Sequence, residues 1–169
     1  MNFKNFLWIF YCCLLPAYVM ATPQIAVLDF ELNDITSLPN TPAERQRTAG
    51  FAPLLIDALN ANPQYTAVSV TTDSQRQANA GFGYLFRYRE QAAALGQQQQ
   101  ADWVIVAQHS KPSFLYSELW VYLVEVKTAK TLARYNIELK GNHQKVTQRA
   151  IAALAKKIAF SLAETPMHR

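Results

Sequence analysis

The sequence predicts a single α/β (α+β) domain, a sandwich in which a mixed sheet of about five strands is flanked by helices. Three observations predict it. Residues 22–169 suffice for one hydrophobic core but not comfortably for two. Runs rich in β-branched residues alternate with segments of helical periodicity. Three consecutive extended runs then precede a last long helix, which gives the order β-α-β-α-β-β-β-α.

Residues 1–21 have the layout of a secretory signal peptide. Lys4 precedes an apolar run, and Val19 and Ala21 are small residues at the minus three and minus one positions of a cleavage site. Pro16 interrupts the apolar run before it reaches the roughly 20 residues of a membrane span. We therefore expect cleavage after Ala21, a periplasmic protein of residues 22–169, and no stable membrane anchor.

Composition excludes several classes of chemistry. Both cysteines, Cys12 and Cys13, fall in the leader, and the bulky Tyr11 argues against lipidation of Cys12. Thiolate catalysis, Cys-ligated zinc and iron–sulfur clusters are thereby excluded from the mature chain. Lys4 is the only charged leader residue, so cleavage lowers the net charge from +4 to +3. No basic arm points to nucleic acid, and we expect no metal and no cofactor.

The first elements are a strand, a polar loop and a helix. Residues 24–32 form the strand. Thr41, Pro42 and Glu44 form a capping box that opens a helix running to about Ala61. Pro53 removes a backbone hydrogen bond, so we expect a kink near Ala49 or two helical pieces. The expected buried stripe comprises Phe51, Leu54, Leu55, Ala58 and Leu59.

A short strand and a weaker helical region follow. Residues 65–70 have the β-branched density of a strand, and Thr72 to Gln75 resemble another capping box. The helical region should run to about Leu95 with a break at Gly81 and Gly83. Gly96 is placed to stop it, and residues 97–100, four glutamines, are interpreted as a solvated loop.

The last part predicts three strands, 102–110, 114–126 and 131–140, and a helix from about His143 to Ala163. Apolar alignment pairs Leu119 with Leu139, Val121 with Ile137 and Leu123 with Tyr135. That register sends Trp120 and Tyr122 to the opposite face, beside Glu138 and Asn136. The final helix has an apolar stripe of Val146, Ala150, Leu154, Ile158 and Leu162.

Asp29 and Glu31 are the first candidate site. Simple alternation puts them on the face of Ile25 and Val27, where two carboxylates could divide acid and base roles in a hydrolase. The interpretation that we favour is structural: Asp29 accepts backbone N–H groups from the following loop, and Glu31 meets solvent.

His109 continues the face of Trp103, Ile105 and Ala107, whereas the adjacent Ser110 points to the other face. The two are therefore poor partners for nucleophilic catalysis, and a hydrogen-bonded structural histidine is favoured. Three scattered histidines make no zinc signature, and no glycine-rich phosphate loop or nucleophile elbow occurs.

Trp120 and Tyr122 have two open interpretations. Exposed aromatic residues beside charges are typical of interfaces, but a helix from residues 72–95 could equally cover them as core.

Several segments together resemble a known family: IAVLDFELND, the Leu-rich turn before YTAVSV, ADWVIVAQHSKPS, and ELKGN before the final helix. They are similar to an uncharacterised family of exported bacterial proteins, a domain of unknown function. That family resembles the broader α/β group of the Tol-system propeller protein's amino-terminal domain and the curli secretion lipoprotein's periplasmic domain. The chain departs from it where relatives have a cysteine pair and here Tyr84 and Tyr88 stand, and where Ala129 replaces a hairpin glycine.

For this group the resemblance implies envelope roles without catalytic residues. The leading hypothesis is a periplasmic, non-enzymatic interaction or accessory protein that binds an envelope partner through its sheet edge or through Trp120 and Tyr122. The alternative is a small-ligand sensor or carrier, with Asp29, Lys111 and Asn142 near strand ends, where open α/β sheets bind ligands. A hydrolase built on Asp29 and Glu31 is the third.

Overall fold

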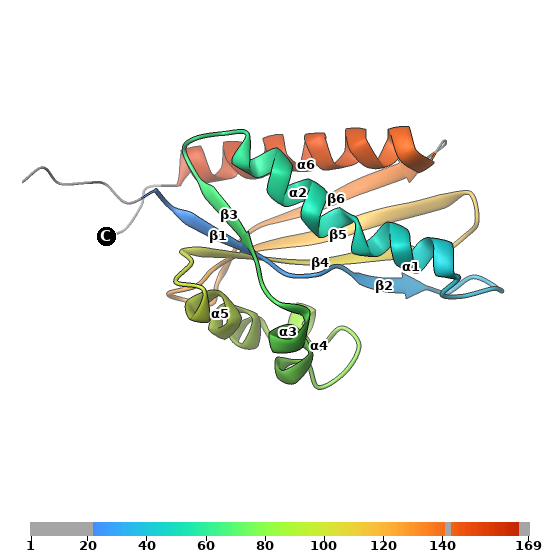
Figure 1. Ribbon diagram of the computed structural model, residues 1–169, viewed down its shortest axis with the longest axis horizontal. Helices are drawn as coiled ribbons and strands as arrows, with labels where there is room; N and C mark the ends of the chain where they lie inside the picture. The colour runs from blue at the N-terminus through green and yellow to red at the C-terminus, as the bar shows by residue number, and fades with distance from the viewer. Residues whose placement is uncertain (1–21, 141–142, 166–169) are drawn as a thin grey trace, which may run out of the picture.

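The computed structural model describes residues 22–140 and 143–165 as three layers, with one mixed sheet between two groups of helices (Figure 1). Helices α1, α2 and α6 cover one face of the sheet, and α3, α4 and α5 cover part of the other. The predicted fold class and element order are confirmed. In the described part of the chain no helix combines the length and the apolar character that crossing a membrane requires. Residues 1–21, with the predicted leader, and Asn142 lie outside the described residues.

The sheet has six strands in the order β3-β1-β4-β5-β6, with β2 also beside β4. β1 pairs in parallel with β3 and β4, and β2 pairs in parallel with β4. β5 is antiparallel to both of its neighbours, β4 and β6. The strands are β1 (Gln24–Val27), β2 (Glu31–Asp34), β3 (Thr66–Ser69), β4 (Trp103–Lys111), β5 (Tyr116–Glu125) and β6 (Thr131–Lys140).

The expected first strand is interrupted by a bulge. Val27 pairs with Ile105 and Glu31 with Gln108. Four residue steps from β1 to β2 therefore lie against three residue steps along β4. One extra residue reverses the alternation of side chains. Glu31 therefore lies on the face of Gln108, opposite the face of Ile25 and Val27. The expectation that Glu31 lies on the same face as Ile25 and Val27 is wrong.

Two helices follow β2, as the sequence predicts for a chain with Pro53. They are α1 (Pro42–Ala49) and α2 (Phe51–Asn60), joined at Gly50. Thr41 caps α1 by accepting the Glu44 N–H at 3.3 Å. The buried stripe of α2 differs from the predicted one, because Ala52 is buried and Leu54 is 38% exposed.

The second layer is built from α3 (Thr72–Ala78), α4 (Tyr84–Arg87) and α5 (Arg89–Gln98). The cap of α3 is Thr71, one residue earlier than predicted. Gly96 does not stop α5. It is buried within the helix, where an added Cβ would lie 2.6 Å from Val126 Cγ2. Gln97 and Gln98 consequently continue the helix, and only the remainder of the glutamine run is a turn.

Two hydrophobic cores lie on the two faces of the sheet. The first, the α2–α6 core, includes Phe51, Ile105 and Leu123, and the second, the α5 core, includes Leu28, Leu95 and Val104. All five residues of the predicted α6 stripe are buried in the first core, and α6 (His143–Glu164) matches the expected last helix.

The hairpin of β5 and β6 has a register two residues away from the predicted one. Leu119 pairs with Ile137, Val121 with Tyr135 and Leu123 with Ala133. A shift of two residues preserves the face of every side chain, so Trp120 still lies opposite the α2–α6 core, beside Asn136. Ala129, which replaces the glycine of relatives, has a left-handed φ of 54°.

Candidate functional site

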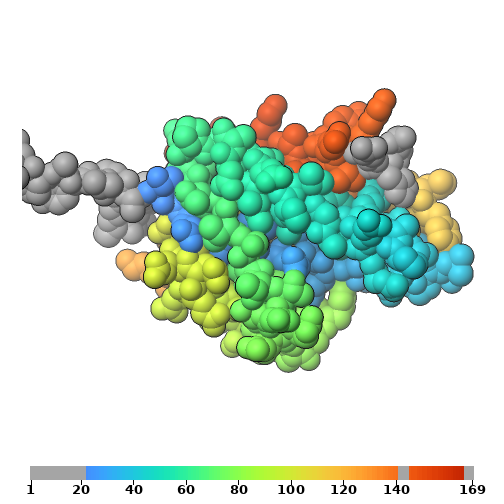
Figure 2. Space-filling view, in the orientation of Figure 1, coloured from blue at the N-terminus to red at the C-terminus, as the bar shows by residue number. Residues whose placement is uncertain are grey.

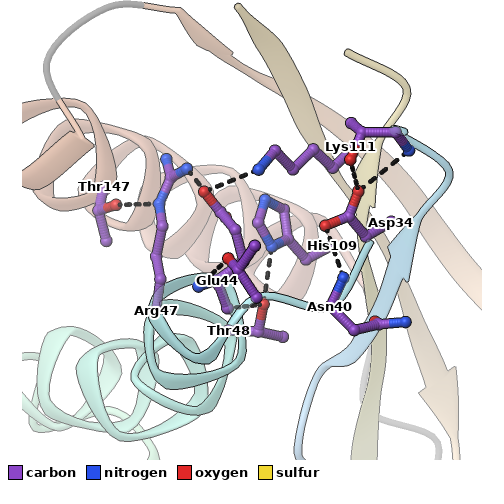
Figure 3. Close-up of polar contacts among 10 residues, drawn as sticks. Asp34, Asn40, Glu44, Arg47, Thr48, His109, Lys111 and Thr147 are labelled. Atoms are coloured by element: carbon purple, nitrogen blue, oxygen red, sulfur yellow. Dashed lines mark hydrogen bonds and ion pairs between the residues drawn. The ribbon is translucent and has the colours of Figure 1, made fainter. Parts of the chain in front are cut away.

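A buried polar cluster joins α1 to the ends of β2 and β4 (Figure 3). Lys111 Nζ lies 3.0 Å from Glu44 Oε1, and Arg47 Nη1 lies 3.7 Å from Glu44 Oε2. Arg47 Nε also donates a hydrogen bond to Thr147 Oγ1 of α6 at 3.3 Å. The cluster therefore ties α1, β4 and α6 together on the α2–α6 side of the sheet.

The charges of the cluster are mutually stabilised. Burial alone would raise the pKa of Glu44, but the hydrogen bond and charge of Lys111, with the charge of Arg47, hold it below its ordinary value. Burial lowers the pKa of Arg47, and the Glu44 carboxylate partly opposes this. The carboxylate is thus ionised between two cations near neutral pH.

His109 lies beneath this ion network and is completely buried. Thr48 Oγ1 donates to the Glu44 carbonyl at 2.8 Å, so its single proton is used and His109 Nδ1 donates to Thr48 Oγ1 at 2.8 Å. Burial, then the Arg47 and Lys111 charges, lower the His109 pKa to about 4. A neutral ring results, whose Nε2 has no hydrogen-bond partner among the described residues.

Asp34, at the end of β2, organises the loop that follows. Its carboxylate accepts hydrogen bonds from the Thr36 N–H and hydroxyl and from the Asn40 N–H. Burial alone would raise the Asp34 pKa, but these bonds, with the charge of Lys111, hold it below its ordinary value. Ile35 N–H adds a bond to the Lys111 carbonyl at 3.2 Å, so the loop is fixed to β4.

A hollow of about 270 Å³ opens beside the cluster, between the ion pairs and the β4–β5 loop. It is lined by Arg47, Lys111, Ser113, Phe114, Leu115, Tyr116, Ser117 and Leu139. Lys111 Nζ lies 5.6 Å from the centre of the Phe114 ring, a cation–π distance.

Large apolar side chains are exposed at the same end of the molecule. Two come from the loop after β2 and two from the β4–β5 loop, and both loops project at the right-hand end of the views (Figures 1 and 2). These four residues, the apolar rim, are Ile35 (69% exposed), Leu38 (67%), Phe114 (54%) and Leu115 (89%).

Asp29 and Glu31 lie on the opposite face, against α3 and α4. Asp29 Oδ2 accepts the Thr72 hydroxyl at 2.7 Å. Glu31 accepts hydrogen bonds from Asn79 Nδ2 and from the Gly83 N–H, both at 2.8 Å. Both carboxylates thus hold the segment around α3 and α4 to the sheet. Asp29 was expected to bond to backbone N–H groups of the following loop and Glu31 to meet solvent, whereas both accept hydrogen bonds from residues 72–83.

The structure does not bring Asp29 and Lys111 together. Asp29 contacts α3 and Lys111 contacts α1, which cover opposite faces of the sheet. Asn142, the third residue of the ligand-carrier hypothesis, lies outside the described part of the chain. Of the two described residues, Lys111 lines the hollow and Asp29 does not.

Of the two interpretations of Trp120 and Tyr122, one applies to each residue. The Tyr122 ring stacks on Phe86 of α4 at 4.1 Å, and the Arg134 guanidinium lies 5.1 Å from its centre on this face. Trp120 is 43% exposed and pairs with Asn136. Helix α4 therefore covers Tyr122 and leaves Trp120 at the surface.

Glu44 and Arg47 of the cluster were not predicted as site residues from the sequence. Glu44 and Thr48 precede Phe51 by seven and three residues, so they extend its buried helical stripe backwards across Gly50. Lys111 continues the inward face of Ile105, Ala107 and His109. A buried acid and a buried lysine each need a partner of opposite charge. This need is the signal from which the pairing of Glu44 with Lys111 could have been predicted.

Comparison with solved structures shows the same fold at low sequence identity. TolB from Acinetobacter baumannii is 18% identical over 86% of this chain, with a TM-score of 0.54, and the chain spans 29% of the TolB chain. Lipoprotein GNA1162 from Neisseria meningitidis is 14% identical, covering 82% of this chain and 98% of its own, with a TM-score of 0.54. The PelC dodecamer from Paraburkholderia phytofirmans is 11% identical, covering 85% and 89%, with a TM-score of 0.53.

No curated protein matches the sequence. A family profile, in contrast, matches residues 23–158, which is most of the chain. The resemblance to a domain of unknown function is thereby confirmed, and the chain belongs to the DUF3280 family, described as "Protein of unknown function (DUF2380)".

Proposed function

We propose that this protein is a non-enzymatic interaction or accessory module of the bacterial envelope, which docks onto another envelope protein in the periplasm. The signal-peptide pattern of residues 1–21 supports the compartment. The shared fold with a protein that is by name a lipoprotein, GNA1162, is consistent with it. The mild charge and the lack of a basic stripe argue against nucleic acid as the partner.

The observation that carries this proposal is the apolar rim on a fixed base. Contiguous exposed apolar groups mark interaction sites in soluble proteins. Asp34 and the bond from Ile35 to Lys111 already order the loop of Ile35 and Leu38. On this side of the rim a partner would therefore meet a preorganised loop, which loses little further conformational entropy on binding.

The use of the ionisable groups supports a non-enzymatic role. Asp29, Glu31 and Asp34 each bond to a loop or helix that they hold in place, and Glu44 of α1 pairs with Lys111 of β4. His109, the buried titratable ring, donates to Thr48 and packs edge-on against Phe51 at 5.1 Å. Catalytic acids and bases need a substrate within hydrogen-bond reach, whereas these groups contact structural partners.

Site-specific photo-crosslinking in growing cells tests the docking surface. A photoreactive residue at Leu115 should capture one defined envelope protein, and the same residue at exposed Gln77 of α3 should not. Trp120 provides a second probe position for the sheet face. Capture at Trp120 alone would move the interface to that face, and equal labelling at all positions, or none at Leu115 and Trp120, would contradict the proposal.

A second candidate function, small-ligand carriage, is favoured by the hollow beside Arg47 and Lys111. Two cations and the Ser113 and Ser117 hydroxyls suit a small carboxylate or phosphate. Thermal unfolding with acetate, succinate and inorganic phosphate tests it, since a ligand at 100 times its Kd adds about 2.7 kcal/mol to the stability of the folded protein. Unchanged unfolding with every anion would remove this candidate.

A further inference from the structure

Strand β6 is a long edge of the sheet. Within the described residues it pairs only with β5, so its outer row of backbone N–H and C=O groups faces away from the sheet. The other edge, β3, has only four residues, whereas β6 has ten. Proteins usually shorten or distort an exposed edge, because an intact edge is a template for another strand.

The outward side chains of β6 are self-complementary in the antiparallel direction. On the face that carries Trp120, β6 presents Arg134, Asn136 and Glu138 in that order. A second β6, related by a twofold axis through Asn136, would place Arg134 opposite Glu138 of the other copy, and Glu138 opposite its Arg134. We infer that two copies of this chain pair through β6 in this register and form one continuous sheet.

Other registers lose this match. A twofold axis perpendicular to the sheet keeps each side chain on its own face of the sheet. The axis must therefore pass beside a residue of β6, and every other register centres it on a different residue. Centring on Ile137 sets Arg134 against Lys140, and centring on Tyr135 sets Arg134 against Asn136 and Glu138 against Leu132. Opposite charges stabilise a strand pair and like charges destabilise it, so among these three registers the pattern favours the one centred on Asn136.

The charged side chains are already held for this contact. Arg134 is stacked over Tyr122 and has no carboxylate partner within the residues that the structure describes. Asn136 is positioned by its 2.7 Å bond to Glu118. Glu138 pairs with Lys140 of its own strand at 2.7 Å, but both side chains are more than half exposed, so this pair is weak and can be shared with an arginine.

Helix α6 packs over β6 on the face of the α2–α6 core. The Tyr135 hydroxyl of β6 donates to Ser161 Oγ, and the Tyr65 hydroxyl, just before β3, donates to the Ala159 carbonyl, so β6 and the start of β3 lie under different sides of α6. Phe160, on the helix face turned away from the sheet, is 63% exposed. In the paired sheet the two α6 helices would run antiparallel above neighbouring strands, and the helix face that carries Phe160 and Lys156 would point away from the sheet.

Charge reversal provides a sharp test, made on protein expressed from the full 169-residue sequence. Sedimentation at about 100 µM should give a dimer for the wild type. Arg134→Glu and Glu138→Arg should each raise the dimer dissociation constant by about tenfold or more, because each creates two like-charge pairs. Mixing these two variants should restore a heterodimer, since every reversed residue then meets an opposite charge.

Lys156→Glu, the same charge change on the exposed face of α6, should leave the dimer intact. Circular dichroism of each variant establishes that the monomer is folded. A wild type that stays monomeric at this concentration overturns the inference, as does a dimer that neither reversal weakens. Failure of the two variants to combine on mixing overturns the proposed register.

Discussion

Lys111 Nζ and Glu44 Oε1 lie 3.0 Å apart, although the two side chains retain only 8% and 7% of their exposure. Both charges of such a buried ion pair have lost their hydration. The pair therefore stabilises the fold only while both partners are present, and a single remaining charge is destabilising. Glu44 comes from α1 and Lys111 from the end of β4, with the hollow beside them. The pair therefore couples the stability of α1 to the geometry of the candidate site.

Replacing Lys111 by methionine should lower the free energy of unfolding by about 3 kcal/mol, because Glu44 loses its nearer cation while remaining buried. For a domain of this size the midpoint of thermal unfolding should fall by roughly 6–12 °C. Lys127→Met, the same change at an exposed position of the β5–β6 turn, is the matched control. In a double-mutant cycle, Glu44→Gln with Lys111→Met should cost less than the sum of the single changes; simple additivity would contradict the coupling.

Stability should fall as the pH drops from about 6.5 to about 4 because of His109. Its pKa is lower in the folded than in the unfolded protein, so its contribution is complete above the unfolded value and is lost towards the folded value. The loss over this window is about 3 kcal/mol. Urea unfolding of wild type and His109→Asn at several pH values measures it. The variant should lose less stability than the wild type across the window, and parallel profiles would exclude this role for His109.

Gly96→Ala should destabilise the protein by about 1–3 kcal/mol, although alanine is the better helix former. The reason is the contact of α5 with the sheet, where the added Cβ would lie 2.6 Å from Val126 Cγ2 and 3.2 Å from Val104 Cβ. Equilibrium unfolding in urea measures the effect. A more stable Gly96→Ala variant would show that helix propensity outweighs the close approach.

Ala129→Gly should stabilise the protein by about 1 kcal/mol, because the residue has a φ of 54° that costs alanine but not glycine. Ala94→Gly, at an exposed position within α5, makes the same chemical change in right-handed backbone and should be destabilising by a similar amount. Thermal unfolding of the pair gives opposite signs if backbone conformation decides the outcome. A loss of stability in both would contradict it.

Elements with a clear period were predictable from sequence, and long-range details were not. The stripe of α6 and the alternation of β6 identified both faces correctly, because burial enforces each period. The predicted register of the β5–β6 hairpin was wrong by two residues. The apolar pattern could not detect this error, because a shift of two residues leaves every side chain on its own face. The irregularity between Leu123 and Val124, which the apolar pattern does not encode, accompanies the observed register.

The candidate site was harder to predict for a different reason. Lys111 was among the predicted binding residues, but its partner Glu44 lies far away in the chain. Glu44 and its second cation, Arg47, approach Lys111 only after α1 packs on the sheet. Asp29 and Glu31 attracted attention because they are neighbours in sequence. Their donors in α3 and around Gly83 depend on the bulge, which reverses the side-chain alternation between β1 and β2.

That bulge sets how the chain can vary without losing its fold. Leu28 and Phe30 are buried in the two cores, and deleting one of residues 28–30 would restore plain alternation and exchange the faces of all side chains in β2. Glu31 would then face the α2–α6 core, which contains Phe51, and Asp34 would turn away from the loop that it binds. The length of the segment between β1 and β2 therefore decides which side chains of β2 face each hydrophobic core.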